Sequence, residues 1–369
     1  MTPVELSRTV LHAVRRAVDA GELAVAVLPE RVVVAPPGPG GCGDYATNVA
    51  LQLARPAGQP APRVAELLRT RLLRTDGISD VVVTGPGFLN ISLDGDADGR
   101  LVRDILRANP RYGHSDILRA GPRYGHSDTL AGQAPELHAA HDARAVVLMD
   151  AVARVLRSQG ARPRLTCAHP PEDAWVRILG VPSDIPVGTG TGTGTRTDPL
   201  RPVPAPADPT PLGRDAARWA LLHPAPHDRP HLGPGHDAAH LAQRETNPLF
   251  RVRYAHARTR ALLRNAADLG FTPEPGPITA DEEAQGLLPL LADHPRVLTA
   301  TAAHRAPDRL ARHLVAVADA LAPLLPSVLP LGDEKPSAAH RARLALAEAA
   351  GTVLAGGLTL LGIDAPDHL

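Results

Sequence analysis

The spacing of apolar positions predicts a small α+β unit within residues 1–93. Leu6, Val10, Val14 and Val18 recur at helical spacing with charged residues between them, so an amphipathic helix is expected in residues 1–20. Valine and leucine are frequent in residues 23–34, which predicts a strand before the turn Pro36-Pro37-Gly38. Further helices are expected at 44–54 and 64–73, and further strands at 81–83 and 88–93, the latter two joined by Gly85-Pro86-Gly87.

Helical spacing returns in the second half of the chain and predicts an all-α bundle. Residues 141–160 form one amphipathic helix, with Ala145, Leu148, Met149, Val152, Val155 and Leu156 on a single face. Residues 213–222 and 247–369 are also helical in pattern. Gly356-Gly357 predicts an interruption of the last helix.

Two stretches between these regions have low complexity. Residues 109–116 recur as residues 121–128 with only the first residue changed, and we interpret this single duplication as a lengthened linker. Gly188–Gly194 alternates glycine with threonine, and prolines are frequent from Pro199 to Pro211. Because such a composition buries little apolar surface, residues 181–212 are expected to be a disordered tether.

Charge and cysteine content narrow the classes of function. The chain has 39 basic and 39 acidic residues, and this balance argues against non-specific coating of nucleic acid while allowing a local basic face. Lys335 is the only lysine. No apolar run approaches the length needed to cross a bilayer, and the first helix carries too many charges for a signal peptide. Two distant cysteines fit a reduced cytoplasm.

Several separated motifs resemble arginyl-tRNA synthetases, in the order in which that family has them. Gly43-Asp44-Tyr45-Ala46-Thr47-Asn48-Val49-Ala50 and Gly85-Pro86-Gly87-Phe88-Leu89-Asn90 resemble its N-terminal additional domain. Residues 215–222 resemble the segment leading from the catalytic core to the anticodon domain. Residues 247–258 (Asn-Pro-Leu-Phe-Arg-Val-Arg-Tyr-Ala-His-Ala-Arg) and 357–366 resemble the start and end of the DALR anticodon-binding domain.

The resemblance is poor in the middle, where that family has its nucleotide-binding core. The tetrapeptide His138-Ala139-Ala140-His141 takes the place of the HIGH signature, with Ala140 instead of the glycine that admits adenine. A lysine-bearing KMSKS-like loop has no counterpart, because Lys335 lies in the C-terminal bundle. Residues 161–212 are too few and too rich in glycine and proline to complete a doubly wound core. The sequence therefore predicts a degenerate remnant without catalytic residues, in which only His138 and His141 survive.

The resemblance also implies contacts with RNA. Phe88 and Asn90 occupy the positions at which, in that family, an aromatic ring stacks on an unstacked nucleotide and an amide contacts its edge. The structural alternative is that Phe88 packs in a core and Asn90 belongs to a turn. Asp44 is expected to cap a helix. Arg251, Arg253, Arg258, Arg260 and Arg264 on one acid-free helix predict a basic patch, with Arg253, Arg260 and Arg264 close to one face. Tyr254 joins this set, whereas His256 is expected to pack.

Two further patterns argue against specific functions, namely recognition of an arginine anticodon and binding of a metal. Leu324-Leu325-Pro326-Ser327 replaces an aromatic segment, and Asp367-His368-Leu369 departs from the family's usual ending, so reading of an arginine anticodon is doubtful. His236 and His240 have the spacing of a zinc helix, but no third ligand is evident and we expect no metal.

We therefore predict four regions. They are an N-terminal-like α+β domain at 1–108, a duplicated linker with an α/β core remnant at 109–180, a tether at 181–212, and an all-α anticodon-binding-type domain at 213–369. The expected function is binding of tRNA, tRNA-Arg foremost, without aminoacylation, to present or sense it. The alternatives are a minimal arginine-tRNA ligase, the only reading that needs ATP, and a protein-interaction module that has lost RNA.

The expected partners follow from this reading. They are tRNA and a synthetase or other tRNA-using enzyme, whereas neither a membrane nor DNA is expected. No cofactor is expected, the setting is the cytoplasm, and the balance of the motifs is against an enzyme.

Overall fold

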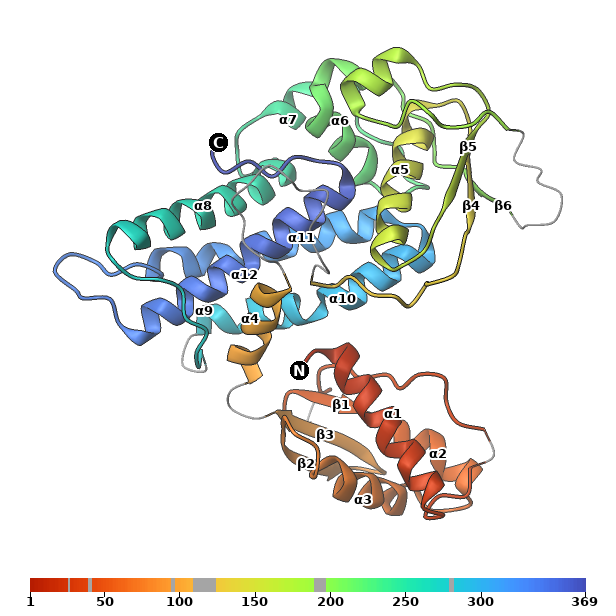
Figure 1. The fold of residues 1–369 in the computed structure, drawn as a ribbon, viewed down its shortest axis with the longest axis vertical. Coiled ribbons are helices and arrows are strands. Elements are labelled where there is room, and N and C mark those ends of the chain that lie inside the picture. Colours follow the sequence, from red (N-terminus) through yellow and green to blue (C-terminus); the bar gives the residue numbers. More distant parts are fainter. Residues whose placement is uncertain (26, 39–41, 94–96, 109–123, 189–196, 279–281) are drawn as a thin grey trace. The chain divides into compact units, whose positions relative to one another are not determined.

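The computed structural model describes the chain apart from residues 26, 39–41, 94–96, 109–123, 189–196 and 279–281 (Figure 1). It consists of two compact units, Met1–Leu101 and Val102–Leu369. Helix α4 (Ala97–Arg107) spans the boundary between them. Buried apolar side chains fill the interior of each unit.

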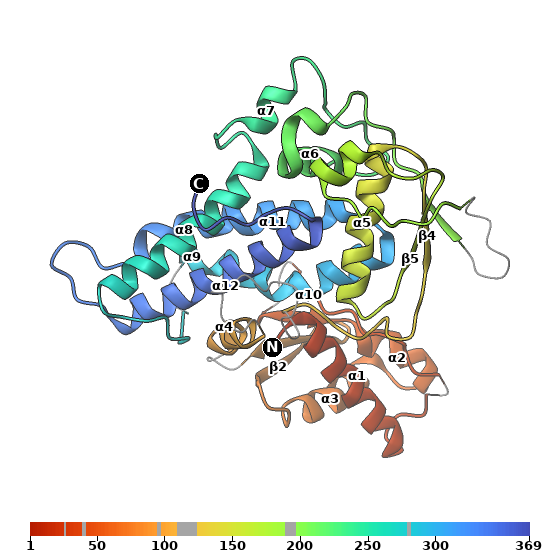
Figure 2. The same ribbon diagram turned by 45° about the horizontal axis from the view of Figure 1, so that its top comes forward.

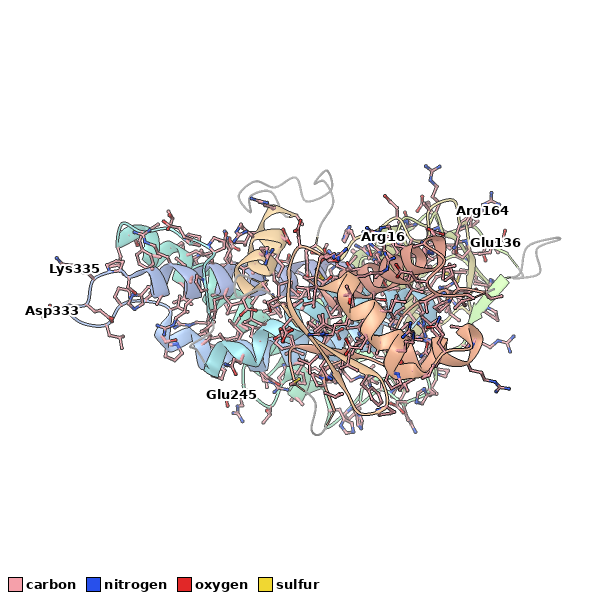
Figure 3. The ribbon with its side chains drawn as sticks, turned by 90° about the horizontal axis from the view of Figure 1, so that it is seen from below. Arg16, Glu136, Arg164, Glu245, Asp333 and Lys335 are labelled. Carbon is pink, nitrogen blue, oxygen red and sulfur yellow. The ribbon has the colours of Figure 1, made fainter. Side chains whose placement is uncertain are left out.

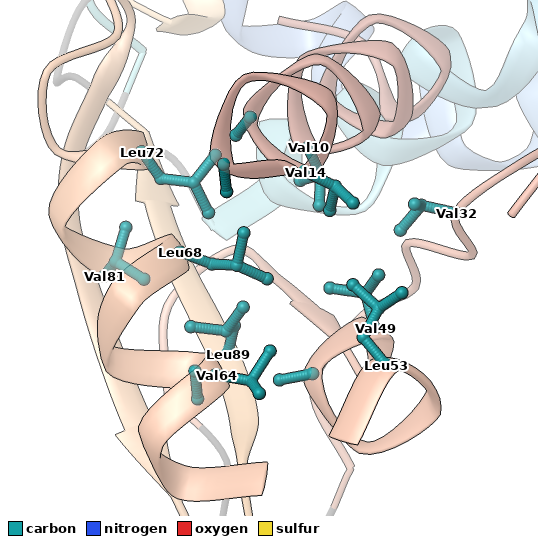
Figure 4. Close-up of a cluster of buried hydrophobic side chains, with 14 of the residues drawn as sticks. Val10, Val14, Val32, Val49, Leu53, Val64, Leu68, Leu72, Val81 and Leu89 are labelled. Carbon is teal, nitrogen blue, oxygen red and sulfur yellow. The ribbon is translucent and has the colours of Figure 1, made fainter. Parts of the chain in front are cut away.

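The first unit packs three helices against an antiparallel sheet of order β1-β3-β2. Side chains from every one of these helices and from β2 and β3 meet in one core, shown in Figure 4. The predicted helix at 64–73 and the strands at 81–83 and 88–93 are confirmed. The elements are α1 (Pro3–Asp19), β1 (Tyr45–Thr47), α2 (Val49–Ala57), α3 (Ala61–Leu72), β2 (Ile78–Thr84) and β3 (Phe88–Leu93).

Two details of this unit differ from the sequence prediction. The described part of residues 23–34 forms no strand, and Leu23, Val25 and Val32 are buried in the core instead. Asp44 caps no helix, because its Oδ2 accepts a hydrogen bond from the backbone N–H of Leu93 at 2.7 Å and the helix begins only at Val49. In both cases partners distant in the sequence override a local preference.

The second unit begins with a parallel sheet of order β5-β4-β6. Its strands are β4 (Glu136–Ala139), β5 (Arg164–Cys167) and β6 (Thr197–Leu200). Helix α5 (Ala143–Ser158) connects β4 to β5 and contacts all three strands as well as helices of the bundle (Figures 1 and 2). A helix with neighbours on both sides is apolar almost all round, and α5 fits this pattern.

The segment predicted as a tether is packed over much of its length. β6 pairs with β4 from Glu136–Thr197 to Ala139–Leu200, and the carbonyl of Val203 accepts a hydrogen bond from Arg144 at 2.7 Å. Prolines are compatible with this because β6 is at an edge of the described sheet, where not every backbone N–H needs a partner. The glycine–threonine tract lies mostly outside the described residues.

Helices make up the rest of the second unit, and the predicted bundle is confirmed. The segment at 213–222 is helical over all of its predicted length. The helices are α6 (Gly213–Leu222), α7 (Asp237–Leu241), α8 (Pro248–Asp268), α9 (Glu282–Gln285), α10 (Leu287–His304), α11 (Pro307–Leu321) and α12 (Ala338–Leu361), and the short helical turns are η1 (Trp175–Leu179), η2 (Thr210–Leu212) and η3 (Ala322–Ser327).

Helix α12 corrects two expectations. It runs without a break through Gly356-Gly357. A Cβ at Gly357 would overlap the side chain of Leu314, so this glycine serves the close approach of α12 and α11 and does not interrupt the helix. It has 24 residues, and an 18-residue window within it has a mean hydropathy of 1.7, so it is long and apolar enough to cross a membrane, although no such run was expected. However, 83% of its apolar window is buried inside the molecule, as in the core helix of a bundle.

A buried arginine joins the parallel sheet region to the bundle. The guanidinium of Arg218 on α6 is fully buried and donates to Asp150 Oδ2 on α5 at 2.6 Å. It also donates to the backbone carbonyls of Leu361 at 2.8 Å and Leu179 at 3.0 Å. Burial lowers the pKa of Arg218, and the adjacent carboxylate of Asp150 opposes that effect. One side chain therefore ties together α5, α6, η1 and the end of α12.

A second buried arginine fixes the loops around α6. Arg144 is 0% exposed and donates only to backbone carbonyls, with no carboxylate among its hydrogen-bond partners. Four of the five acceptors lie in segments without regular structure, and the fifth, Leu221, lies in the last turn of α6, where carbonyls lack a partner within the helix, so all of them need an outside donor. The carbonyls belong to Val203, Leu221, Pro224, Ala225 and Asp228.

We predict that Arg218→Met destabilises the second unit by roughly 3–5 kcal/mol, because it strips Asp150 of its buried partner and leaves two carbonyls without a donor. The exposed Arg157 on α5 supplies the matched control, since Arg157→Met should change stability by less than about 0.5 kcal/mol. Urea unfolding followed by circular dichroism measures both. Equal stabilities of the two variants would contradict the role given to Arg218.

The second copy of the duplicated motif is part of this packing, whereas the first lies outside the described residues. Tyr124 Oη donates to the carbonyl of Leu291 at 3.0 Å, and Gln159 Nε2 donates to the carbonyl of Gly125 at 3.1 Å. The Tyr124 ring stacks on His294, which stacks on His313 with centroids 5.3 Å apart. This copy is therefore more than the linker that was expected.

The stacked histidines make stability depend on pH. Burial lowers the pKa of His313 from 6.5 to about 4 and lowers the pKa of His294 well below its usual value. Asp293, which raises the pKa of His313, and Arg296, which lowers it, are its charged neighbours, while His126 and His313 lower the pKa of His294. As pH falls below 6.5 the unfolded chain takes up protons that the folded chain refuses until pH about 4.

We therefore predict that the free energy of unfolding falls between pH 6.5 and 4, with His313 contributing on the order of 3 kcal/mol. His313→Leu should flatten this dependence, whereas His304→Leu, at an exposed position on α10, should leave it unchanged. Urea titrations at several pH values measure the slope. An unaltered slope in His313→Leu would rule out this assignment.

Candidate functional site

The hairpin of the first unit separates the two residues that were expected to contact RNA together. Phe88 is 41% exposed at the start of β3, whereas Asn90 is only 2% exposed. The Nδ2 of Asn90 donates to Thr84 Oγ1 at 2.6 Å and to the carbonyl of Val82 at 3.4 Å, so its amide closes its own hairpin. Gly87 is constrained too, with φ of 131° and Ala61 3.1 Å from where a Cβ would lie. Phe88 alone presents a free side chain here.

The parallel sheet places His138 and His141 where strand order reverses. β4 is central, with β5 on one side and β6 on the other, so the carboxyl end of β4 is a topological switch point. Open α/β sheets bind ligands at such points. Asp142 caps α5 by accepting a hydrogen bond from the N–H of Ala145 at 3.0 Å. A strand, a loop and a capped helix therefore meet at this switch point.

The two histidines at this point are engaged by the protein itself. His138 Nδ1 lies 3.1 Å from Thr166 Oγ1 on the neighbouring strand. His141 Nε2 lies 3.1 Å from the carbonyl of Pro170, and its ring is 5.0 Å from Trp175 and 5.5 Å from His169. Sequence reasoning did not identify Trp175 or His169, because only the fold brings them to His141. Lys335 lies elsewhere, in the loop between η3 and α12 (Figure 3).

Helix α8 carries the predicted arginines on the two edges of its exposed side. Seven residues return a helix to nearly the same angle, so Arg253 and Arg260 share one edge, and Arg251 and Arg258 share the other. The buried side between them includes His256, whose Nδ1 lies 3.2 Å from the carbonyl of Gly351. His256 therefore packs inside the bundle, as was expected.

Carboxylates from other elements neutralise most of these arginines. Arg251 forms a two-point ion pair with Asp319 of α11 at 2.8 and 2.9 Å. Arg253 lies 3.5 Å from Asp215 of α6, and Arg260 donates to Asp367 at 3.0 Å. No local pattern reveals these partners, because they are 38, 68 and 107 residues away. The basic patch is thus weaker than the sequence of the helix indicates.

The side chains of α8 that still face solvent are few. Arg258 and Arg264 are exposed, and Arg264 Nη2 lies 3.4 Å from His368 Nδ1. Tyr254 is 46% exposed and stacks on Phe250 with ring centroids 5.5 Å apart. An aromatic ring between exposed cations can stack on a base while the arginines hold phosphates. Tyr254, Arg258 and Arg264 therefore remain exposed on α8.

His236 and His240 do not converge on a common point for a metal ion. His240 Nε2 lies 2.7 Å from the carbonyl of His231, while the rings of His231 and His236 are 5.5 Å apart. Within the described residues no group of three or more His, Cys, Asp or Glu side chains could hold a metal.

Comparison with known protein families confirms the two domains that the motifs predict at the two ends of the sequence. Residues 5–93 match the arginyl tRNA synthetase N-terminal domain, and residues 252–369 match the DALR anticodon binding domain. The arginine–tRNA ligase of Renibacterium salmoninarum is 42% identical over 163 residues, which is 44% of this chain but only 29% of that relative. The ligase of Frankia alni is 40% identical over 160 residues, or 43% of this chain and 28% of the relative.

Solved structures show the same fold. Thermus thermophilus arginyl-tRNA synthetase has a TM-score of 0.65 at 14% identity, and the Plasmodium falciparum enzyme has 0.62 at 9%, each covering 100% of both chains. The fold is therefore that of an arginyl-tRNA synthetase with a helical DALR domain at its C-terminal side. The chain is an arginyl-tRNA synthetase-like protein, as its motifs indicate.

We predict unequal losses of stability at the two hairpin positions. Asn90→Ala should destabilise the first unit by roughly 1–3 kcal/mol, since it removes the two hydrogen bonds that the buried amide donates to Thr84 Oγ1 and the carbonyl of Val82. Phe88→Ala, at an exposed position, should cost less than about 0.5 kcal/mol. Urea unfolding of both variants measures the difference. If Asn90→Ala were as stable as the wild type, its buried hydrogen bonds would have no structural role and a binding role would regain weight.

Proposed function

We propose that this chain binds tRNA, with tRNA-Arg as the first candidate, and does not activate arginine. The arginyl-tRNA synthetase N-terminal domain and the DALR anticodon-binding domain are both present, and both belong to a tRNA-binding family. The exposed Phe88 and the exposed set of Tyr254, Arg258 and Arg264 supply one aromatic ring on each unit and cations on the second. Contacts on two units of one chain add through effective concentration.

The observation that carries the absence of ligase chemistry is the short path from β6 to α6. Only twelve residues, 201–212, separate the end of β6 at Leu200 from Gly213. The carbonyl of Val203 on this path is held by Arg144, and Leu212 is buried. This segment has no room for the remaining strands and helices of a doubly wound nucleotide-binding core.

The residues at the switch point support the same proposal. Ala140 replaces a glycine at the place where adenine would lie against bare backbone, and His141 is packed by Trp175 and His169. The positive charge that would stabilise a departing pyrophosphate has no lysine source, because Lys335 lies beyond η3. We therefore propose that the chain binds tRNA and that another protein aminoacylates it. The role of this chain would be to present the tRNA to that protein or to sense its aminoacylation.

Two other functions each have one observation in their favour. The intact strand β4, loop and helix α5 around His138 and His141 favour a minimal ligase, for which ATP would be a substrate. The pairing of Arg251, Arg253 and Arg260 with carboxylates favours a protein-interaction module. If the chain is a protein-interaction module, the exposed arginines on α8 should not be needed for RNA binding. The following experiment separates this alternative from the main proposal.

We predict that the full chain binds a tRNA-Arg transcript more tightly than an unrelated RNA of equal length at 150 mM KCl. Arg258→Gln with Arg264→Gln should weaken this binding and lower the slope of log affinity against log salt by about 1–2. Arg157→Gln with Arg309→Gln removes the same charge from exposed positions on α5 and α11 and should change neither value. Fluorescence anisotropy provides the measurement. Equal binding of both RNAs would reject the proposal.

A further inference from the structure

A basic cleft lies in the first unit, between α1 and the end of α3. Its volume is about 560 Å³, and its charged lining consists of Arg8, His12, Arg16, Arg71, Arg74 and Asp76. Residues 8, 12 and 16 are spaced four apart, so they follow one another along a single face of α1. Arg71 belongs to the last turn of α3, and Arg74 follows that helix. Arg16 is one of the labelled side chains in Figure 3.

Most of the positive charge in this cleft is uncompensated. Arg71 pairs with Glu22 at 2.8 Å. Arg8, Arg16 and Arg74 are exposed, and in the part of the chain that the structure describes they have no ion-pair partner. Among the residues that line the cleft, Asp76 is the single acidic side chain. Their situation contrasts with that of α8, where carboxylates meet most of the arginines.

The cleft does not follow from a generally basic unit. Residues 1–101 contain ten arginines and eleven acidic residues, so the unit has a net charge of −1, yet four of the ten arginines line this one hollow. Gathering like charges around a concave surface raises the electrostatic free energy unless an anion is attracted there. A solvated helix face would be expected to carry both signs in an otherwise balanced chain.

The chemistry of the lining selects phosphates over bases. Apart from His12, the lining has no aromatic ring, and it contains neither asparagine nor glutamine, so stacking and reading of base edges have little support. Guanidinium groups bind phosphate oxygens through two donors in a fixed fork. Several of them along one groove match a phosphodiester backbone, whose charges repeat, better than a single small anion.

We propose that this cleft holds the phosphate backbone of RNA at a place distinct from Phe88. Gly87 approaches Ala61 at the start of α3, whereas the cleft is at the other end of that helix, roughly 16 Å along its axis. The inference rests on the proposed binding of tRNA and adds a sequence-independent anchor to it. The cleft fixes position on the RNA, and the aromatic residues elsewhere contact bases.

The test compares three variants of the full chain with a fluorescein-labelled tRNA-Arg transcript between 50 and 200 mM KCl. Arg8→Gln/Arg16→Gln/Arg74→Gln should lower the salt slope by about 2–3, so that its affinity falls roughly 15- to 65-fold less than that of the wild type over this range. Asp76→Asn should steepen the slope and tighten binding. Arg15→Gln/Arg31→Gln/Arg55→Gln removes the same charge from exposed positions outside the cleft and should leave the slope unchanged.

Circular dichroism and thermal melting confirm that the variants fold, since all of these positions are exposed. A cleft variant with the slope of the wild type overturns this inference alone, because tRNA binding itself would persist. Equal losses in the cleft variant and in the matched control also overturn it, since they would indicate a general charge effect. A wild-type chain that binds no tRNA overturns the inference and the proposed function together.

Discussion

The guanidinium of Arg218 sets the architecture of the second unit, because it is fully buried and its donors must all be met inside the protein. Asp150 on α5, the carbonyl of Leu179 and the carbonyl of Leu361 meet them. These acceptors come from the parallel sheet region and from the end of α12. The short sheet therefore cannot separate from the bundle without leaving a buried charge unpaired.

This constraint explains how a short sheet of three parallel strands stays folded in the second unit. Three parallel strands and one crossover helix bury too little surface to be stable alone. Here α5 is buried against α6, α10 and α12 on one part of its surface and against the strands on another. The bundle supplies apolar cover for α5 that the three strands alone do not give. Gly362, with φ of 73°, sits against the Arg218 guanidinium, where a side chain would clash.

Periodicity predicted most elements, because apolar spacing reports directly on burial of a helix face or a strand. It located β2 and β3, the helix at 213–222 and the helices of the bundle. It failed at 23–34, at Asp44 and at the proline-rich segment, where partners distant in the sequence decide the conformation. Electrostatics were the least predictable part. Asp319, Asp215 and Asp367 neutralise arginines of α8, and no local pattern marks them.

We propose that the β5-β4-β6 sheet and its surroundings hold tRNA-binding domains together and do not activate an amino acid. Arginine-dependent exchange of pyrophosphate into ATP, measured with the full chain and saturating tRNA-Arg, tests this proposal. We expect exchange at the level of a control without protein, with arginine present or absent. Exchange above that level in the wild type that is abolished in the His138→Ala or His141→Ala variant would contradict the proposal.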